Sequence, residues 1–389
     1  MQKSGNGSQS RVLHTQIFQE LRDRILAGDL KAGDRLPAEL KIAEQYNTSR
    51  GTVRQALTAL VSEGLLQRVQ GSGTFVSESA PAQRRSIPGV APQATKSIGV
   101  ILSDVSDELN MSILRGIEQA TRPCGYQLSF AYAEENTQAM ALDIMRLKAN
   151  TDGLIIFPLS NVSHDEAIAQ LQQESFPFVL VDRYLSDLDS DHVTSDNLGG
   201  GYRATEHLLI LGHRRIGFAY GSVGNLLTTS VRDRWEGYRK ALYEYHQPYD
   251  EKLVCNLTID KKHDPSAMTF DEIMSSPDRP SAFFAVNGSI ALELFHAAQR
   301  RGVRIPEDLA LVGFDDLHYM ALMSVPLTTV AQQGIEMGMH AGTLLINRIE
   351  SQISGAPKHI KLPTNLIIRQ SCGARLRIAN ESSVKVQPS

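Results

Sequence analysis

The stretch SRGTVRQALTALVSEGLL, residues 49–66, decides the fold of the first part of the chain. Its apolar side chains recur at helical spacing and predict one buried face, made of Val53, Ala56, Leu57, Leu60 and Val61. Ser49 is expected to cap this helix, and Gly64 stands where it would end. The polar side chains predicted to point away from the core are Arg50, Thr52, Arg54, Gln55 and Thr58. A solvated helix face would look the same, so the neighbouring sequence has to decide between the two interpretations.

The flanking sequence predicts two further helices and a hairpin. A helix over residues 14–27 would bury Ile17, Leu21 and Ile25. The segment GDRLPAELKIAEQYN opens a second helix, and LLQRVQGSGTFV alternates like two strands around Gly71-Ser72-Gly73. Two helices joined by a short turn and followed by a two-stranded wing form a winged helix-turn-helix.

The run LPAELKIAEQYNTSRGTVRQALTALVSEGLLQRVQGSGTFV resembles the DNA-binding domain of the GntR family of bacterial regulators, over about residues 14–77. In such a domain the third helix enters the major groove of DNA. Arg50 and Arg54 on its first turns can each donate two hydrogen bonds to a guanine. Gly71 would let the backbone of the wing approach the minor groove. The predicted DNA-binding residues are Arg35, Ser49, Arg50, Thr52, Arg54, Gln70 and Gly71.

Charge and composition agree with this division of the chain. The net charge is −4, but residues 1–77 carry +3 and the remainder carries −7. A basic module joined to an acidic one favours a polyanionic partner for the first part only. The chain has no apolar run long enough to cross a membrane, and its first residues lack the apolar core of a secretory signal, so we expect a cytoplasmic protein without a membrane partner.

No residue pattern indicates catalysis, a metal or a cofactor. The three cysteines, Cys124, Cys255 and Cys372, are far apart and fit plain thiols in a reducing compartment. The segment NLGGGYRA has the glycines of a phosphate-binding loop but lacks its lysine, so it predicts the start of a helix. We therefore expect a protein that is not an enzyme and that holds no metal and no cofactor.

Residues 78–96 are rich in Pro, Ser, Ala and Gln without periodicity, which predicts a flexible linker. Beyond them short apolar strands alternate with helix-length stretches: SIGVILS, YQLSFAY, DGLIIFP, PFVLVDR, RIGFAYG, SAFFAVN and LALVGFDD. This alternation predicts parallel sheets covered by helices, and the number of strands indicates two doubly wound lobes. The predicted domains are residues 1–77, 78–96 and 97–375, followed by a disordered tail, 376–389.

The second half resembles the sensor domain of LacI/GalR repressors, which is similar to periplasmic sugar-binding proteins. The likeness rests on IGVILSD, GLIIFPL, VLVDR, SDNLGGGYRATEHLLILGHRRIGF, VRDRWEGYRKAL, LALVGFDD and VPLTTVAQQGIEMG. It implies that Arg234 clamps a ligand, with Asp182, Asn287 and Gln332 at other pocket positions. Trp235, the single tryptophan, fits core packing as well as it fits a platform for a sugar ring.

Parallel sheets bind ligands beyond the carboxyl ends of their strands, which directs attention to the strand exits. The predicted effector-binding residues are Ser103, Asp104, Phe157, Asp182, Arg183, Arg234, Asn287 and Gln332. Two positions depart from the family pattern. DELN stands where an aromatic loop is usual, and Asn287-Gly288 stands where Asn-Asp is usual. The effector is therefore either bound differently from a typical sugar or is not a simple neutral sugar.

Together these features predict a multidomain protein, with an N-terminal winged helix-turn-helix and a two-lobed α/β domain of the periplasmic-binding-protein type. The pairing resembles transcription regulators of the arabinose-repressor type, whose ligand does not follow from the likeness. We expect a dimeric repressor that binds a pseudo-palindromic operator in double-stranded DNA and is released by a small-molecule effector, a sugar or a derivative. The alternatives are an activator of the same architecture, a sugar-binding protein and a sugar-metabolising enzyme.

Overall fold

The structure is a computed structural model that describes residues 17–22, 24–25, 29–46, 48–62, 65–69, 73–77, 95–102, 108–133, 136–159, 162–221, 228–257, 269–351 and 354–374. The chain divides into two compact units, Met1–Gln93 and Ala94–Ser389, called here the reader and the sensor. The predicted linker, apart from Thr95 and Lys96, and the predicted tail lie outside the described residues. None of the described helices is both long and apolar enough to cross a membrane.

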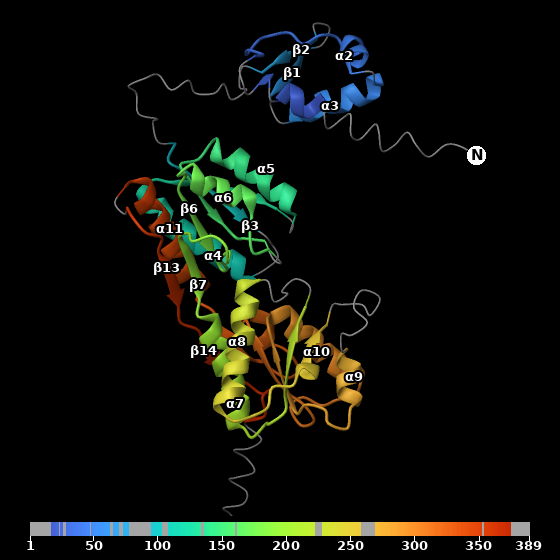
Figure 1. Ribbon diagram of the computed structural model, residues 1–389, viewed down its shortest axis with the longest axis vertical. Helices are drawn as coiled ribbons and strands as arrows, with labels where there is room; N and C mark the ends of the chain where they lie inside the picture. Colours follow the sequence, from blue (N-terminus) through green and yellow to red (C-terminus); the bar gives the residue numbers. More distant parts are fainter. Residues whose placement is uncertain are drawn as a thin grey trace, which may run out of the picture. The chain divides into compact units, whose positions relative to one another are not determined.

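The reader is a winged helix (Figure 1). Residues 17–22 and 24–25 are helical and precede α2 (Glu39–Gln45) and α3 (Arg50–Ser62). The wing pairs β1 (Leu66–Val69) antiparallel with β2 (Gly73–Val76). Its core is an apolar cluster in which the predicted faces of the first and third helices meet: Ile17, Leu21, Ile25, Leu36, Ile42, Ala43, Val53, Ala56, Leu57, Leu60, Leu65, Leu66 and Val76.

The first lobe of the sensor is a six-stranded parallel sheet in the order β4-β3-β5-β6-β7-β13. Its strands are β3 (Ser97–Leu102), β4 (Gln127–Tyr132), β5 (Gly153–Ile156), β6 (Phe178–Val181), β7 (His192–Ser195) and β13 (His359–Leu362). The apolar residues alternate between two cores, as β3 shows: Ile98 and Val100 face one core and Ile101 the other.

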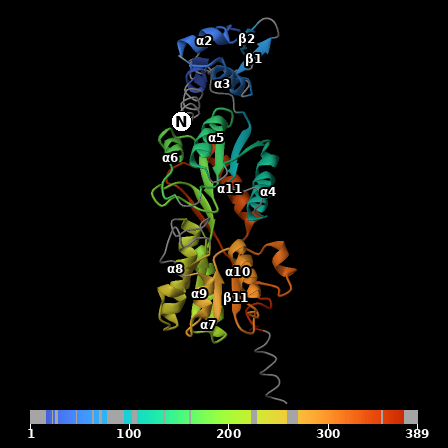
Figure 2. The ribbon, with the colours of Figure 1, turned by 90° about the vertical axis from the view of Figure 1, so that its right-hand side faces the viewer.

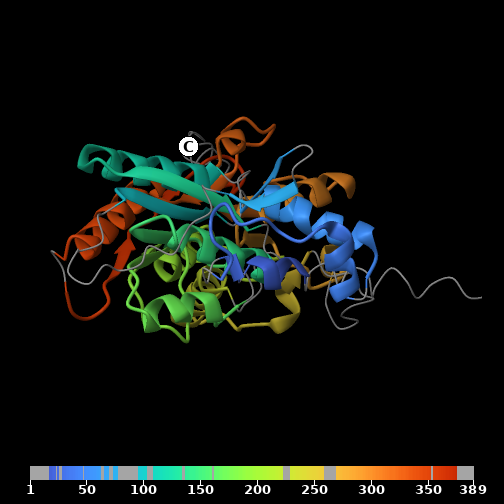
Figure 3. The same cartoon turned by 90° about the horizontal axis from the view of Figure 1, so that it is seen from above.

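Helices cover both faces of this sheet. One core includes residues of α4 (Glu108–Thr121) and α11 (Gly334–Ile349), and the other includes residues of α5 (Thr137–Lys148) and α6 (Glu166–Gln173). Helices α4 and α11 lie side by side (Figures 2 and 3), because glycines allow their backbones to touch. A Cβ atom on Gly338 would lie 2.0 Å from the carbonyl oxygen of Ile113.

The second lobe repeats the plan with the strand order β9-β8-β10-β11-β12-β14, in which only β14 is antiparallel. Its strands are β8 (Ile216–Tyr220), β9 (Val254–Asn256), β10 (Ala282–Ala285), β11 (Ala310–Phe314), β12 (Thr328–Ala331) and β14 (Asn365–Ile367). Its helices are α7 (Asn197–Ile210), α8 (Thr229–Glu244), α9 (Phe270–Ser275) and α10 (Gly288–Arg300). The predicted α/β architecture with two lobes is therefore confirmed.

The described elements place three crossings between the lobes: from β7 to α7, from β12 to α11, and from β13 to β14. The first crossing contains the NLGGGYRA segment, which begins α7 as predicted, with the Asp196 carboxylate accepting the N–H of Gly199. The second crossing begins at Gln332, one of the predicted effector residues. The crossings therefore place residues of both lobes around one interface.

Candidate functional sites

The start of α3 carries the two arginines that the sequence singled out. Ser49 caps the helix as predicted, because its hydroxyl oxygen accepts the backbone N–H of Thr52 at 3.1 Å. Arg50 and Arg54 are both exposed on the turns that follow. Gln70 and Gly71, the predicted wing contacts, lie outside the described residues.

The prediction that Thr52 points away from the core is wrong. Its side chain is 3% exposed, and its hydroxyl lies 2.9 Å from that of Ser49. The position is four residues before Ala56 and eight before Leu60, so it extends the buried face of α3 by one more turn. A short polar side chain can occupy this place because the capping serine satisfies its hydroxyl.

Basic side chains gather around a groove of about 1100 Å³ between α2, α3 and the wing. The groove is lined by Arg35, Leu36, Pro37, Ala38, Glu39, Lys41, Arg54, Leu57, Arg68, Val69, Gly73 and Thr74. It brings together Arg35 and Arg54 from the predicted set and adds Lys41 and Arg68, which are outside that set. Four cations beside one open groove form a surface suited to phosphates and base edges.

Glu39 lies among these cations and orients two of them. Its carboxylate accepts a hydrogen bond from Arg54 Nη2 at 3.0 Å and lies 3.7 Å from Arg68 Nη2. The hydrogen bond to Glu39 raises the pKa of Arg54. Glu39 lies in the second predicted helix, but its role does not follow from the sequence, because partners 15 and 29 positions away leave no local pattern.

The sensor contains a buried polar network at the carboxyl ends of its strands. Arg234, on α8, is 4% exposed and donates to Asn197 Oδ1 at 2.9 Å and to the carbonyl of Val286 at 2.8 Å. Its guanidinium carbon lies 3.7 Å from the ring centroid of Phe314, and its Nη2 lies 3.8 Å from Asp315 Oδ1. The predicted clamping arginine is therefore held in one orientation from several sides.

Asp315 connects this network to the crossing between the lobes. It accepts a hydrogen bond from Gln332 Nε2 at 2.6 Å, and the N–H of Gly288 points to it at 3.4 Å. Asp315 stands at the exit of the predicted strand LALVGFDD but is not among the predicted effector-binding residues. The rule that ligands bind beyond the carboxyl ends of parallel strands, applied to this strand, points to Asp315.

Two aspartates occupy matching places in the two lobes. Asp182 follows β6 and Asp315 follows β11, each the fourth strand of its sheet, and each has a φ of 70°. A left-handed backbone is uncommon outside glycine, and aspartate tolerates it better than most residues. Asp182 is buried and pairs with the adjacent Arg183 at 3.1 Å. Such conformations at strand exits are typical of functional positions.

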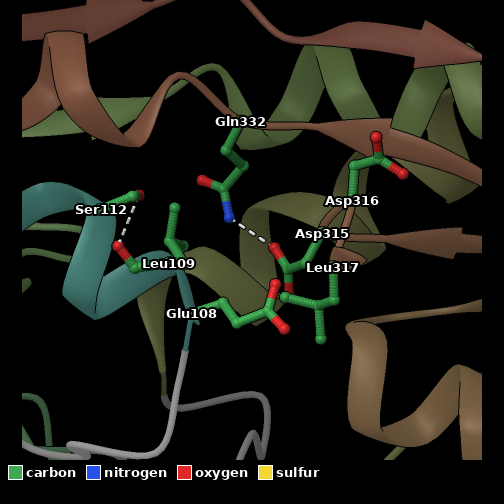
Figure 4. Close-up of a pocket in the computed structure, with 7 residues that line it drawn as sticks. All are labelled: Glu108, Leu109, Ser112, Asp315, Asp316, Leu317 and Gln332. Atoms are coloured by element: carbon green, nitrogen blue, oxygen red, sulfur yellow. Dashed lines mark hydrogen bonds between the residues drawn. The ribbon is translucent and has the colours of Figure 1, made fainter. Parts of the chain in front are cut away.

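A cavity of about 180 Å³ lies between the lobes beside this network (Figure 4). Its lining comes from α4, from the segment after β11 and from the end of β12: Glu108, Leu109, Ser112, Asp315, Asp316, Leu317 and Gln332. Gln332 is the predicted effector residue that lines it directly, and Figure 4 shows its side chain reaching toward Asp315. The DELN segment, which departs from the family pattern, supplies Glu108 and Leu109.

The remaining predicted effector residues have other roles in the structure. Phe157 is 1% exposed inside the core of the first lobe, so its predicted place in a ligand pocket is wrong. Asn287 caps α10 by accepting the N–H of Ile290 at 2.9 Å. Trp235 packs beside Tyr249 and Arg239 in the second lobe, away from the cavity lining. Ser103 and Asp104 lie outside the described residues.

Gly288 explains one departure from the family pattern. A Cβ atom at this position would lie 2.5 Å from Leu317 and 2.7 Å from Met320. The usual aspartate would therefore displace Leu317, which lines the cavity. The backbone N–H of Gly288 is directed at Asp315.

Known proteins match both halves of the chain. Residues 13–76 match the family of bacterial regulatory proteins called the gntR family, and residues 205–372 match the periplasmic binding protein-like domain. The chain is 30% identical over 366 residues to the arabinose metabolism transcriptional repressor of Geobacillus stearothermophilus, covering 92% of this chain and 97% of that protein. It is 29% identical to the repressor of the same name from Halalkalibacterium halodurans, covering 86% and 89%.

The sensor is also similar to a solved structure, a LacI family transcriptional regulator from Enterococcus faecium with bound ribose. The TM-score is 0.58 at 27% identity, over 71% of this chain and 98% of that one. A winged-helix reader with a cationic groove, joined to a two-lobed sensor, defines the class of transcription regulators. The chain belongs to the family of the arabinose metabolism transcriptional repressors. In this chain a gntR-type domain precedes a periplasmic-binding-protein-like domain. The prediction of a regulator rather than an enzyme is confirmed by these relatives.

Proposed function

We propose that this protein is a cytoplasmic repressor that binds a pseudo-palindromic operator as a homodimer and leaves it when a sugar or sugar derivative binds the sensor. The observation that carries the effector site is the network of Arg234, Asp315 and Gln332 beside a cavity between two lobes. Buried polar groups at strand ends are suited to the hydroxyl groups of a small polar molecule. The relatives named as repressors of arabinose metabolism favour repression over activation.

The contacts between the lobes suggest how a ligand acts. Tyr184 of the first lobe and Thr229 of the second exchange two hydrogen bonds, at 3.1 Å and 2.9 Å. The carboxylate of Glu108 on α4 accepts the N–H of His318 in the second lobe at 2.9 Å. A molecule that contacts both lobes in the cavity favours the arrangement in which these bonds are made. Effector binding thereby shifts the equilibrium between lobe arrangements.

An exposed sheet edge supports the homodimer. Strand β4 is an outer strand of the first lobe, and its side chains Phe130 and Tyr132 are 65% and 41% exposed. An uncovered edge with aromatic side chains is a favourable surface for a second copy of the chain. A dimer doubles the contacts of the reader on a symmetric operator.

The operator is tested by footprinting the DNA that flanks the gene with the purified full-length protein. We expect a protected inverted repeat whose half-sites lie about one helical turn, or a multiple of it, apart. Arabinose, ribose and other sugars are then screened for a rise in melting temperature and for loss of the footprint. Binding without sequence preference at physiological salt, or chemical conversion of a sugar that binds, would contradict the proposal.

A further inference from the structure

The described side chains that line the cavity between the lobes present mainly hydrogen-bond acceptors. The amide group of Gln332 donates one of its two N–H bonds to Asp315, and its Oε1 is buried without a hydrogen-bond partner among the described residues. The hydroxyl of Ser112 donates to the carbonyl of Leu109 at 2.8 Å, so it too offers only lone pairs. The other polar lining groups are the carboxylates of Glu108, Asp315 and Asp316. A ligand that fills the cavity is therefore expected to bring more donors than acceptors.

The three carboxylates differ in how their charge is balanced. Asp315 faces Arg234 at 3.8 Å, and Asp316 accepts two hydrogen bonds from Arg369, at 2.6 Å and 3.0 Å. Although burial opposes ionisation, the hydrogen bonds from Arg369 and Thr329 hold the pKa of Asp316 below its ordinary value.

Glu108, the third carboxylate, accepts the backbone N–H of His318, and no arginine or lysine among the described residues forms an ion pair with it. It stands at the start of α4, whose N–H groups stabilise a negative charge. The lining therefore carries one carboxylate charge that described basic side chains do not balance.

We propose that the effector is a polyhydroxylated amine, of which amino sugars are the simplest example, and that Glu108 selects its ammonium group. This inference rests on the proposed function, because it assumes that the effector occupies this cavity. An ammonium group has three donors and no acceptor, which matches a lining made mainly of acceptors. It also balances the charge of Glu108, whereas a phosphate or carboxylate on the ligand would place a second negative charge beside that carboxylate.

The test compares matched probes on the full-length protein. Glucosamine, galactosamine and mannosamine are each measured by calorimetry and thermal shift against the parent sugar and its 6-phosphate. We expect at least one amine to bind roughly 10- to 100-fold more tightly than its parent, as a charge-assisted hydrogen bond would give. The phosphates should not bind.

Two variants test whether Glu108 causes the preference for the amine over its parent sugar. Glu108→Gln keeps the shape of the side chain and should reduce the preference for the amine over its parent to less than about threefold. Glu118→Gln is the control on the same helix, where the carboxylate pairs with Arg122 at the surface, and it should keep the full preference. Melting curves of both variants check that they are folded.

The outcomes separate this inference from the proposed function. A neutral sugar or a sugar phosphate that binds as tightly as its amine, or an unchanged preference in Glu108→Gln, would overturn the selection of an amine and leave the repressor intact. If none of these probes binds and no neutral sugar from the screen releases the operator, the proposed sugar effector itself is wrong.

Discussion

An arginine paired with a carboxylate occurs at both candidate sites, in opposite surroundings. In the reader, Arg54 and Glu39 lie 3.0 Å apart with side chains 62% and 22% exposed. In the sensor, Arg234 and Asp315 lie 3.8 Å apart with side chains 5% and 14% exposed. An exposed pair contributes little to stability, so its arginine can exchange the carboxylate for a base or a phosphate. A buried pair is costly to break, so its arginine stays in place while a ligand comes to it.

The largest effect is expected from Arg234→Met, which removes the cation from the buried network. Asp315 would then lack its guanidinium neighbour, and Asn197 and the carbonyl of Val286 would lose their donor. We expect the free energy of unfolding of the sensor to fall by about 3–5 kcal/mol. Urea unfolding followed by the fluorescence of Trp235, the single tryptophan, reports on this unit alone.

Arg239→Met is the matched control on the same helix. Its guanidinium lies 4.7 Å from the Trp235 ring and 5.1 Å from the Tyr249 ring at an exposed position. The expected loss is at most about 1 kcal/mol. If the two variants lose the same free energy of unfolding, the buried position of Arg234 does not make it more important for stability than the exposed Arg239.

A second prediction concerns the proposed dimer surface at strand β4. Phe130→Glu places a charge on the exposed edge strand β4 and should weaken the dimer by at least about 2 kcal/mol. Sedimentation over a range of protein concentrations measures the change. Because Phe130 is 65% exposed in the single chain, the melting temperature of the monomer should change little. If the dissociation constant of the dimer is unchanged, the dimer interface does not include Phe130.

The third prediction tests the exposed arginine directly. Arg54→Ala should cost about 1–3 kcal/mol in operator binding and relax the base preference at one position, because Arg54 is expected to read a guanine edge. Arg68→Ala, in the same groove, should weaken binding evenly across sequences, as a phosphate contact does. Titration of operator variants at fixed salt measures both. An unchanged base preference in Arg54→Ala would remove it from base readout.

The smallest effect on stability is expected from Glu39→Gln. Loss of an exposed ion pair should change the free energy of unfolding by less than about 1 kcal/mol. The same change removes a negative charge from a cationic groove, so affinity for DNA of random sequence should rise at low salt. A large loss of stability would mean that the pair in the reader is structural, like the one in the sensor.

The elements with a regular apolar repeat could be predicted from the sequence. The buried faces of the helices in the reader follow the 3.6-residue repeat, and the apolar strands of the sensor mark its sheets. The strands β7, β9, β12, β13 and β14 were not predicted, because each is three or four residues long and has little apolar pattern. The burial of Thr52 was not predicted either, since its cap bond to Ser49 lets a polar side chain extend an apolar face.

The candidate sites were predicted only in part, because their partners are far apart in sequence. Arg234 was selected by resemblance, and the structure adds Asp315, which lies 81 positions along the chain and beside it in space. Phe157 was selected as a strand exit, yet the first residue after a buried strand can still face the core. Glu39 and Glu108 were not selected, because a carboxylate at a helix start reads as a local charge until the opposing surface is known.

The central claim is that the two sites are coupled, and operator affinity measured with and without effector tests it most directly. Fluorescence anisotropy of a labelled operator is recorded with the full-length protein, using the sugar or amine that raises its melting temperature most. We expect operator affinity to fall by roughly 5- to 150-fold at saturating effector, the usual range of coupling between two sites. A ligand that stabilises the sensor while operator affinity stays the same would contradict the account.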